Sequence, residues 1–216
     1  MSAFTLVIGD KNWSSWSMRP WLVMRHFAIP FNEVPVGLRR DDTRENILQY
    51  SPSGQVPILI DTEDDLKIWD SLAICEYLAE TYPDRGLWPN DPAARAHARS
   101  VSAEMHGGFM PMRREMPMEC NARYEARNWP DDVQSNIDRI KAIWQDCRRL
   151  NPHRAQEDRA ADFLFGRFTI ADAMFAPVVS RFVTYGVSLD GMPEVEAYVR
   201  AMWNLAAFGD WRAGTG

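Results

Sequence analysis

The sequence is poor in cysteine, with only Cys75, Cys120 and Cys147 among its 216 residues. An odd number of widely spaced cysteines, with no C-x-x-C pair, does not predict a disulfide framework or a redox pair. The N-terminus also lacks the basic and then apolar segments that mark a secretory signal peptide. These absences predict a protein of the reducing cytoplasm.

Long apolar runs and clustered positive charge are missing too. No stretch reaches the ~18 consecutive apolar residues of a membrane span, so no membrane association is expected. The chain has 24 Lys and Arg against 30 Asp and Glu, a net charge of −6, and no basic run extends beyond pairs such as Arg39-Arg40. Nucleic-acid partners are not expected, because neutralising phosphates requires clustered Lys and Arg. The histidines show no metal-ligand spacing, so no metal is predicted. They are His26, His97, His106 and His153.

Apolar residues, by contrast, make up 46% of the chain and aromatic residues 12%, which is enough to fill a core. The first part of the chain alternates short apolar runs with amphipathic stretches, which predicts the order βαβαββα. Pro35 places the second strand at a sheet edge, and Pro20 places the start of the first helix near Ser15 to Ser17. The expected strands are 4–8, 31–36, 56–60 and 66–69, and the expected helices are 19–28, 42–50 and 70–82.

The pattern becomes entirely helical after a proline-rich linker. We therefore predict an α/β domain at 1–83, a linker at 84–92 and an all-helical domain at 93–216. Four short strands bury little by themselves, so the two domains are expected to pack on each other as one body. The expected helices are 93–118, kinked near Gly107-Gly108, then 131–150, 169–185 and 195–208.

Serines gather in the turn between the first strand and the first helix, in the motif Ser14-Ser15-Trp16-Ser17. Backbone N–H groups at a helix N-terminus stabilise an anion, and a hydroxyl there can donate to a thiolate and lower the pKa of the thiol. The alternative is ordinary helix capping, for which serine is a common residue.

Two further motifs offer groups to an extended peptide. Gln55-Val56-Pro57 opens the third strand, and Val56 would present its N–H and C=O to a ligand if Pro57 is cis; the alternative is a trans proline at a strand start. Asp70-Ser71 precedes the third helix and offers a carboxylate for an ammonium group, and a hydroxyl and an N–H for a carboxylate. The alternative for this pair is again capping.

The order and spacing of these motifs resemble the glutathione transferase superfamily, and the serine loop is most similar to the serine-type zeta and tau classes and their bacterial relatives. Thr169 to Asp172 resemble the family's N-capping box. The resemblance covers nearly the whole chain. It implies a thioredoxin-like α/β domain with a four-stranded mixed sheet, followed by an all-α bundle. It also implies a homodimer and a role in detoxification.

The resemblance also implies the chemistry, with glutathione as co-substrate and no metal. Ser14 would hydrogen-bond the glutathione sulfur, with Ser15 as the second choice and Ser17 facing into the first helix. The favoured thiolate would then attack a small hydrophobic electrophile. The implied activity is that of a glutathione transferase.

Five residues are implied to hold the rest of glutathione. Val56, beside a cis Pro57, would bind the cysteinyl backbone, and Gln55 would touch the glycyl end or the peptide. Asp70 and Ser71 would hold the γ-glutamyl end.

The second substrate is expected in the helical domain, beside Trp16. Met105, Phe109 and Met112 lie at helical spacing and are predicted to line this pocket; the alternative for each is plain core. The arginines of the same stretch are predicted to form a solvated or subunit-facing side. They are Arg95, Arg99, Arg113 and Arg114.

Departures from the zeta pattern bear on the reaction. Trp16 stands where zeta members usually have cysteine, and Thr184 stands where zeta isomerases have an arginine for a substrate carboxylate, with Arg181 one turn earlier. These departures weaken a maleylacetoacetate-isomerase-like activity and favour a broad transferase or peroxidase. A non-catalytic ligand carrier or interaction module is the alternative of another class, whereas a cysteine-type thiol reductase lacks its loop cysteine.

Overall fold

The computed structural model describes residues 3–149 and 162–215. Its first part follows the order βαβαββα that the sequence predicts. The elements are β1 (Phe4–Gly9), α1 (Ser15–His26), β2 (Phe31–Val36), α2 (Thr43–Leu48), β3 (Ile58–Asp61), β4 (Leu66–Trp69), α3 (Ser71–Thr81) and a short 3-10 turn η1 (Pro83–Arg85).

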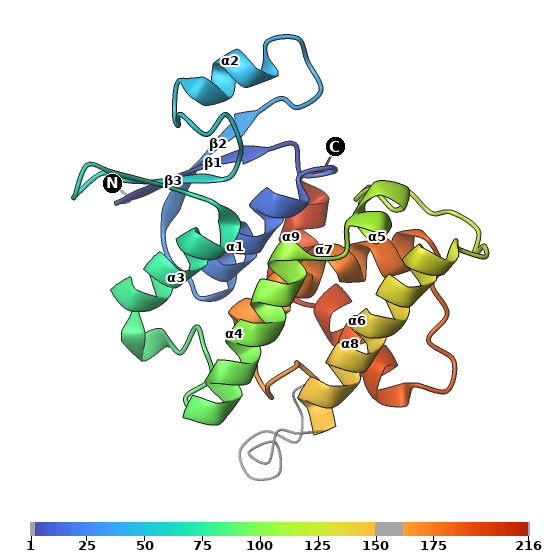
Figure 1. Cartoon of the computed structure of the whole chain (residues 1–216). Coiled ribbons are helices and arrows are strands. Elements are labelled where there is room, and N and C mark those ends of the chain that lie inside the picture. Colours follow the sequence, from blue (N-terminus) through green and yellow to red (C-terminus); the bar gives the residue numbers. More distant parts are fainter. Residues whose placement is uncertain (1–2, 150–161, 216) are drawn as a thin grey trace.

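The four strands form one mixed sheet in the order β2-β1-β3-β4. β1 pairs parallel with β2, whereas β3 runs antiparallel to both β1 and β4. β2 lies at an edge, as Pro35 predicts. Alternate side chains of β1 point to opposite faces: Leu6 joins the main core, and Val7 packs in a small cluster with Ile47 of α2. Figure 1 shows α2 on one face of the sheet and α1 and α3 on the other.

The second part of the described chain is helical. The helices predicted at 131–150 and 169–185 are confirmed, and their described ends differ from the predicted ones by at most one residue. Residue 150 and His153 lie outside the described residues. The helices are α4 (Pro92–Gly107), α5 (Met110–Glu115), α6 (Asp131–Arg149), α7 (Ile170–Thr184), α8 (Pro193–Trp203) and α9 (Ala206–Ala213).

Two long helices expected from the sequence are each two helices in the structure. The stretch 93–118 does not kink but breaks, because Phe109 adopts a left-handed backbone with φ +65. A Cβ at Gly108 would lie 2.8 Å from the carbonyl oxygen of Glu104, so only glycine fits this turn. The stretch 195–208 breaks at Leu205, whose backbone is extended between α8 and α9. Apolar residues recur at helical spacing across both breaks, so the sequence pattern does not indicate where the helices end.

A single hydrophobic core joins the two parts, as expected. α1 packs against α7, and α7 is buried along almost its whole length. The capping box at its start is confirmed: the backbone N–H of Thr169 donates to Asp172 Oδ2 at 2.8 Å. Within residues 3–149 and 162–215, no helix has both the length and the apolar character needed to cross a membrane.

Candidate active site

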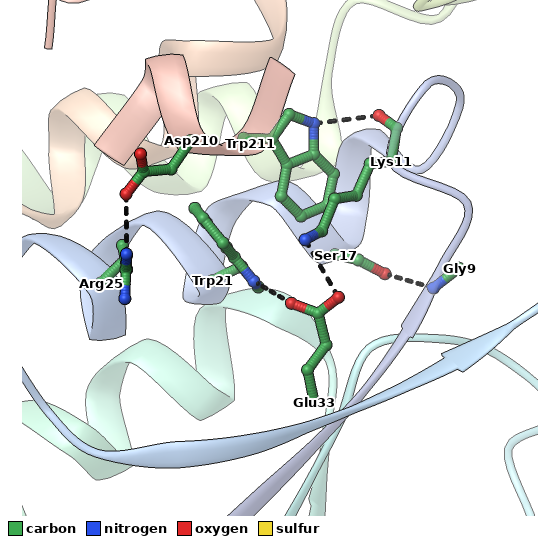
Figure 2. A network of polar contacts seen from close by, with 8 residues as sticks. All are labelled: Gly9, Lys11, Ser17, Trp21, Arg25, Glu33, Asp210 and Trp211. Atoms are coloured by element: carbon green, nitrogen blue, oxygen red, sulfur yellow. Dashed lines mark hydrogen bonds and ion pairs between the residues drawn. The ribbon is translucent and has the colours of Figure 1, made fainter. Parts of the chain in front are cut away.

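The loop after β1 leads into the N-terminus of α1, and its serines are buried. Ser14 occupies the N-cap position but makes no capping hydrogen bond with its side chain. Its hydroxyl instead donates to Ser17 Oγ at 2.7 Å, and the N–H of Gly9 donates to the same oxygen at 3.1 Å. Ser17 therefore faces inward and ties the start of α1 to the end of β1 (Figure 2).

The C-terminal helix α9 holds the loop from the other side. The indole N–H of Trp211 donates to the carbonyl oxygen of Lys11 at 2.9 Å. The Lys11 ammonium lies 4.7 Å from the centre of the Trp21 ring and pairs with Glu33 at 2.9 Å. Figure 2 shows this network, in which α1, β2 and α9 meet around Lys11. The residues just before Ser14 are thus fixed by segments from both halves of the chain.

A cavity of about 520 Å³ lies beside this loop. The structure brings all five predicted glutathione-binding residues to its wall, together with Trp16 and His106. The peptide bond between Val56 and Pro57 is cis, as the family resemblance implies. The five residues are Gln55, Val56, Pro57, Asp70 and Ser71.

Asp70 caps α3, so the capping alternative is correct for this residue. Its Oδ1 accepts hydrogen bonds from the N–H groups of Leu72 at 2.9 Å and Ala73 at 3.2 Å. Its Oδ2 points elsewhere and lies 3.0 Å from Nε2 of His106 on α4. Capping uses only one carboxylate oxygen and leaves the other at the cavity.

A buried arginine lies behind the cavity. Arg19 is fully buried, and its Nη1 donates to Ser71 Oγ at 3.4 Å. Its Nε and Nη2 have no hydrogen-bond partner among the described residues. Its guanidinium stacks 4.2 Å from the centre of the Trp16 ring. Burial lowers the pKa of Arg19, and the nearby cations Arg113 and Arg181 lower it further.

A second cavity of about 270 Å³ lies on another side of Trp16, which lines both cavities. Ser15 lines this second cavity, whereas Ser14 lines neither. Its wall is cationic and aromatic, so it suits an anionic or planar ligand. The wall also contains Trp13, Arg39, Arg113, Pro117, Met118 and Arg181.

Arg113 corrects one prediction from the sequence. It is half-buried rather than part of a solvated side, and it lines the second cavity. Its Nε donates to the carbonyl oxygen of Gly108 at 2.9 Å, and its guanidinium lies 4.9 Å from the centre of the Trp16 ring. The break between α4 and α5 turns this side chain inward.

The predicted pocket residues of the helical half lie in the core. Met105 and Met112 are fully buried and Phe109 is 9% exposed. None of the three lines either cavity described above. Their surroundings are those of core residues, which is the alternative that the sequence left open. A role for them in holding the second substrate stays a prediction.

Sequence reasoning did not assign Arg19 or His106 to the site. Arg19 lies one helical turn after Ser15, and this i, i+4 spacing on the first helix was an available signal. His106 offers no local signal, because its contact with Asp70 joins two helices far apart in the sequence.

Comparisons with known families agree with the geometry. Residues 13–81 match the family model described as the N-terminal domain of glutathione S-transferase, and residues 122–201 match the model of its C-terminal domain. The chain is 32% identical over 194 residues to a probable maleylacetoacetate isomerase of Caenorhabditis elegans, covering 90% of this chain and 86% of that protein. It is also 32% identical over 207 residues to the glutathione S-transferase GstB of Escherichia coli K12, covering 91% and 92%.

Solved structures share the fold. A glutathione transferase homologue from Burkholderia with bound glutathione superposes with a TM-score of 0.68 at 24% identity, covering 100% of this chain and 98% of that one. Ure2p in complex with glutathione gives a TM-score of 0.73 at 20% identity, covering 98% and 94%. With both family models matched in order and relatives at 32% identity along most of its length, the chain belongs to the glutathione S-transferase family.

Proposed function

We propose that this protein is a glutathione transferase that activates the glutathione thiol with a serine of the loop before α1. The observation that carries the proposal is the cavity of about 520 Å³ lined by all five predicted glutathione-binding residues. Its volume falls in the range of roughly 300–1,000 Å³ that small-molecule sites occupy. Relatives named as glutathione S-transferases support the same reaction class.

The γ-glutamyl end of glutathione would lie at the N-terminus of α3. Asp70 Oδ2 would accept from its ammonium group, and the Ser71 hydroxyl and N–H would donate to its carboxylate. Arg19, whose Nη1 lies 3.4 Å from Ser71 Oγ, would add a positive charge behind that carboxylate. Val56, next to the cis Pro57, would pair with the cysteinyl backbone and direct the sulfur toward the serine loop.

A serine hydroxyl would then favour the thiolate. A free thiol with a pKa of ~8.5 is only a few per cent ionised at pH 7. Lowering that pKa by ~2 units requires ~2.7 kcal/mol of differential stabilisation of the thiolate. Ser14 would supply it by turning its hydroxyl from Ser17 to the sulfur, helped by the N-terminus of α1. Ser15 is the alternative donor, and its place at the second cavity supports it.

Alanine variants of the two serines test this assignment. With saturating glutathione, ultraviolet absorbance of the thiolate across pH gives the pKa of the bound thiol. Losing the catalytic hydroxyl should raise that pKa toward ~8.5 and slow turnover of an activated aryl halide by about 50-fold near pH 6.5. Ser100→Ala, at an exposed position on α4, is the control.

Each outcome of this experiment is informative. If neither Ser14→Ala nor Ser15→Ala changes the thiol pKa, the serine mechanism is wrong. If the wild-type protein binds S-methylglutathione but turns over no electrophile, the chain is a carrier rather than an enzyme.

Glutathione-dependent isomerisation is a second candidate. The supporting observation is the cationic wall of the second cavity, to which Arg181 and Ser15 both contribute. Burial lowers the pKa of Arg181 to about 9, so it stays charged at neutral pH. Relatives named maleylacetoacetate isomerase act on a substrate that carries carboxylate groups, and arginines suit such a substrate. Thr184, at the position of the isomerase arginine, instead donates to the carbonyl oxygen of Glu119 at 3.1 Å.

Substitution of Arg181 separates the two reactions. Arg181→Gln should abolish isomerisation of maleylacetoacetate while conjugation of an uncharged aryl halide persists. Arg95→Gln, an arginine that lines neither cavity, is the control. Equal loss of both reactions would rule out a role for Arg181 as a carboxylate ligand, and absence of any isomerisation in the wild-type protein would leave the transferase alone.

We also propose a cytoplasmic homodimer that takes part in detoxification. The family resemblance is the basis for proposing a dimer. Exposed apolar side chains such as Leu66 and Met110 offer surface that a second copy could cover. Sedimentation velocity at micromolar concentration should give twice the mass of one chain; the mass of a single chain would contradict the dimer.

A further inference from the structure

His106 brings an ionisable group from the helical half into the glutathione cavity. It lies on α4, yet its Nε2 is 3.0 Å from Oδ2 of Asp70 at the start of α3. Its ring also packs edge-on against Trp16, with ring centres 5.1 Å apart. The imidazole therefore touches two residues of the cavity wall and connects the two halves of the chain across it.

The two oxygens of Asp70 have different partners. Oδ1 is committed to capping, since it accepts from the N–H groups of Leu72 and Ala73. Oδ2 is the oxygen left for a ligand, and it is the one that His106 contacts. An ammonium group arriving at Asp70 must therefore share Oδ2 with the imidazole.

The surroundings of His106 favour its neutral form. Burial lowers its pKa, Arg19 on α1 and Arg113 on α5 lower it further, and only Asp70 raises it. These three are the charged groups that face it from the elements packed around it. Nδ1 is buried with no hydrogen-bond partner in the described part of the chain. Protonation would thus create a buried donor without an acceptor, which is costly.

The charge of the imidazole changes what Oδ2 can do. A neutral imidazole donates one Nε2–H to Oδ2 and leaves the carboxylate its full negative charge and a second lone pair. A protonated imidazole forms an ion pair with the same carboxylate and repels an arriving ammonium group. The contact therefore supports binding of a cationic group in one protonation state and opposes it in the other.

We propose that His106 is a positioning residue that sets the affinity for the γ-glutamyl ammonium group through Asp70. Neutral, it orients Oδ2 toward the ligand; protonated, it occupies that oxygen and weakens binding. This inference rests on the proposed binding of glutathione in the cavity. It makes glutathione affinity dependent on pH through the contact between His106 and Asp70.

Calorimetric titration with S-methylglutathione tests the inference, because this ligand has no thiol to ionise. For the wild-type protein, the dissociation constant should increase about fivefold as the pH falls from about 7.5 to about 5.0, a range above the usual pKa of an Asp carboxyl. His106→Gln keeps a neutral donor for Asp70 and cannot be protonated, so its affinity should stay constant over this range. A ligand that lacks the α-amino group should bind the wild-type protein with no pH dependence.

Two comparisons keep the result unambiguous. His97→Gln, on the same helix but outside the cavity, should retain the wild-type pH dependence. The pKa of His106, measured by NMR, should fall when S-methylglutathione binds, because coupling between proton and ligand is reciprocal. Identical pH profiles for the wild-type protein and His106→Gln would overturn the inference and leave the proposed function intact. Failure of the wild-type protein to bind S-methylglutathione at any pH would overturn the proposed function itself.

Discussion

Arg19 is a single residue whose burial we attribute to ligand binding rather than to stability. It is fully buried, and two of its three nitrogens have no partner among residues 3–149 and 162–215. An unpaired buried cation costs several kcal/mol relative to water. Its Nη1 donates to Ser71 Oγ at 3.4 Å, and in the proposed complex the ligand carboxylate beside Ser71 would compensate the rest of its charge.

We therefore predict that Arg19→Met separates affinity from stability. Replacing a buried cation by an apolar side chain of similar length should leave the free energy of unfolding unchanged or higher. Affinity for S-methylglutathione should fall by about tenfold or more, which corresponds to about 1.4 kcal/mol. Urea unfolding and calorimetric titration measure the two quantities.

Arg25→Met is the matched control for this variant. Arg25 lies on the same helix but is exposed and pairs with Asp210 at 2.9 Å, a contact distant from the cavity wall. It should lose at most about 1 kcal/mol of stability and keep the wild-type affinity. An Arg19→Met protein that is strongly destabilised, or that binds normally, would show that the charge serves the fold.

Among the helices, α9 holds the loop between β1 and α1 in place. Trp211 donates to the carbonyl oxygen of Lys11 and packs edge-on against Trp21, with ring centres 5.3 Å apart. The N–H of Cys120 donates to the carbonyl oxygen of Asn12 at 3.3 Å from the other side. Besides its own turn, in which the N–H of Ser14 donates to the carbonyl oxygen of Asp10 at 2.8 Å, the segment preceding Ser14 is therefore held by α9 and by the loop that contains Cys120.

Trp211→Phe is predicted to loosen this loop without unfolding the protein. An aromatic ring is kept at this position, and the lost hydrogen bond costs about 1 kcal/mol of stability. Hydrogen exchange of the amides of residues 11–14 should accelerate, and kcat should fall by a few fold because the serines are less well positioned. Trp203→Phe, whose ring stacks on Arg212 away from Lys11, should change neither quantity. Unchanged hydrogen exchange in Trp211→Phe would show that α9 does not hold this loop in place.

The start of α7 gives a pH-dependent prediction of stability. Burial raises the pKa of Asp172 from 3.8 to about 7, although hydrogen bonds from Leu164 and Thr169 oppose the shift. The folded state then binds a proton between about pH 4 and 7 that the unfolded state has released. The contribution of this group to stability is complete below about pH 4 and is lost as the pH rises through 7.

Asp172→Asn removes this titration. The free energy of unfolding of the wild-type protein, minus that of Asp172→Asn, should therefore decrease steadily as the pH rises from about 4.5 to 7.5. Urea unfolding of both proteins at several pH values measures the difference. Asp162→Asn, at a less buried position in the same segment, is the control. A constant difference would mean that Asp172 stays ionised throughout and that the hydrogen bonds of the capping box outweigh burial.

Over the chain as a unit, the sequence predicted the elements of the sheet-bearing half well, and the five residues proposed to bind glutathione do line one cavity, although their contact with glutathione stays a prediction. Apolar alternation, Pro35 and the Asp70-Ser71 cap are local signals, and each described a real feature of the structure. Two features were missed: the helix break, which follows from the close approach of Gly108 to the Glu104 carbonyl and the left-handed backbone of Phe109, and the inward turn of Arg113, whose guanidinium lies over the ring of Trp16 from the other half of the chain. The contact between His106 and Asp70 belongs to the same class.

The two halves of the chain should fold and unfold as one unit. Trp21 and Leu22 of α1 are buried in the same core as Phe175 of α7, and Trp21 contacts Trp211 of α9. Exposing a few such side chains costs roughly 1.5–3 kcal/mol each, which is comparable with the 5–15 kcal/mol of a typical domain. The full chain should therefore unfold in urea in one transition, with coincident curves from tryptophan fluorescence and far-ultraviolet circular dichroism. Residues 1–85 expressed alone should show no cooperative transition, because the core face of α1 would lie in water. Two separate transitions of the full chain, or cooperative unfolding of the fragment, would mean that the sheet-bearing half is stable without the helices that cover it.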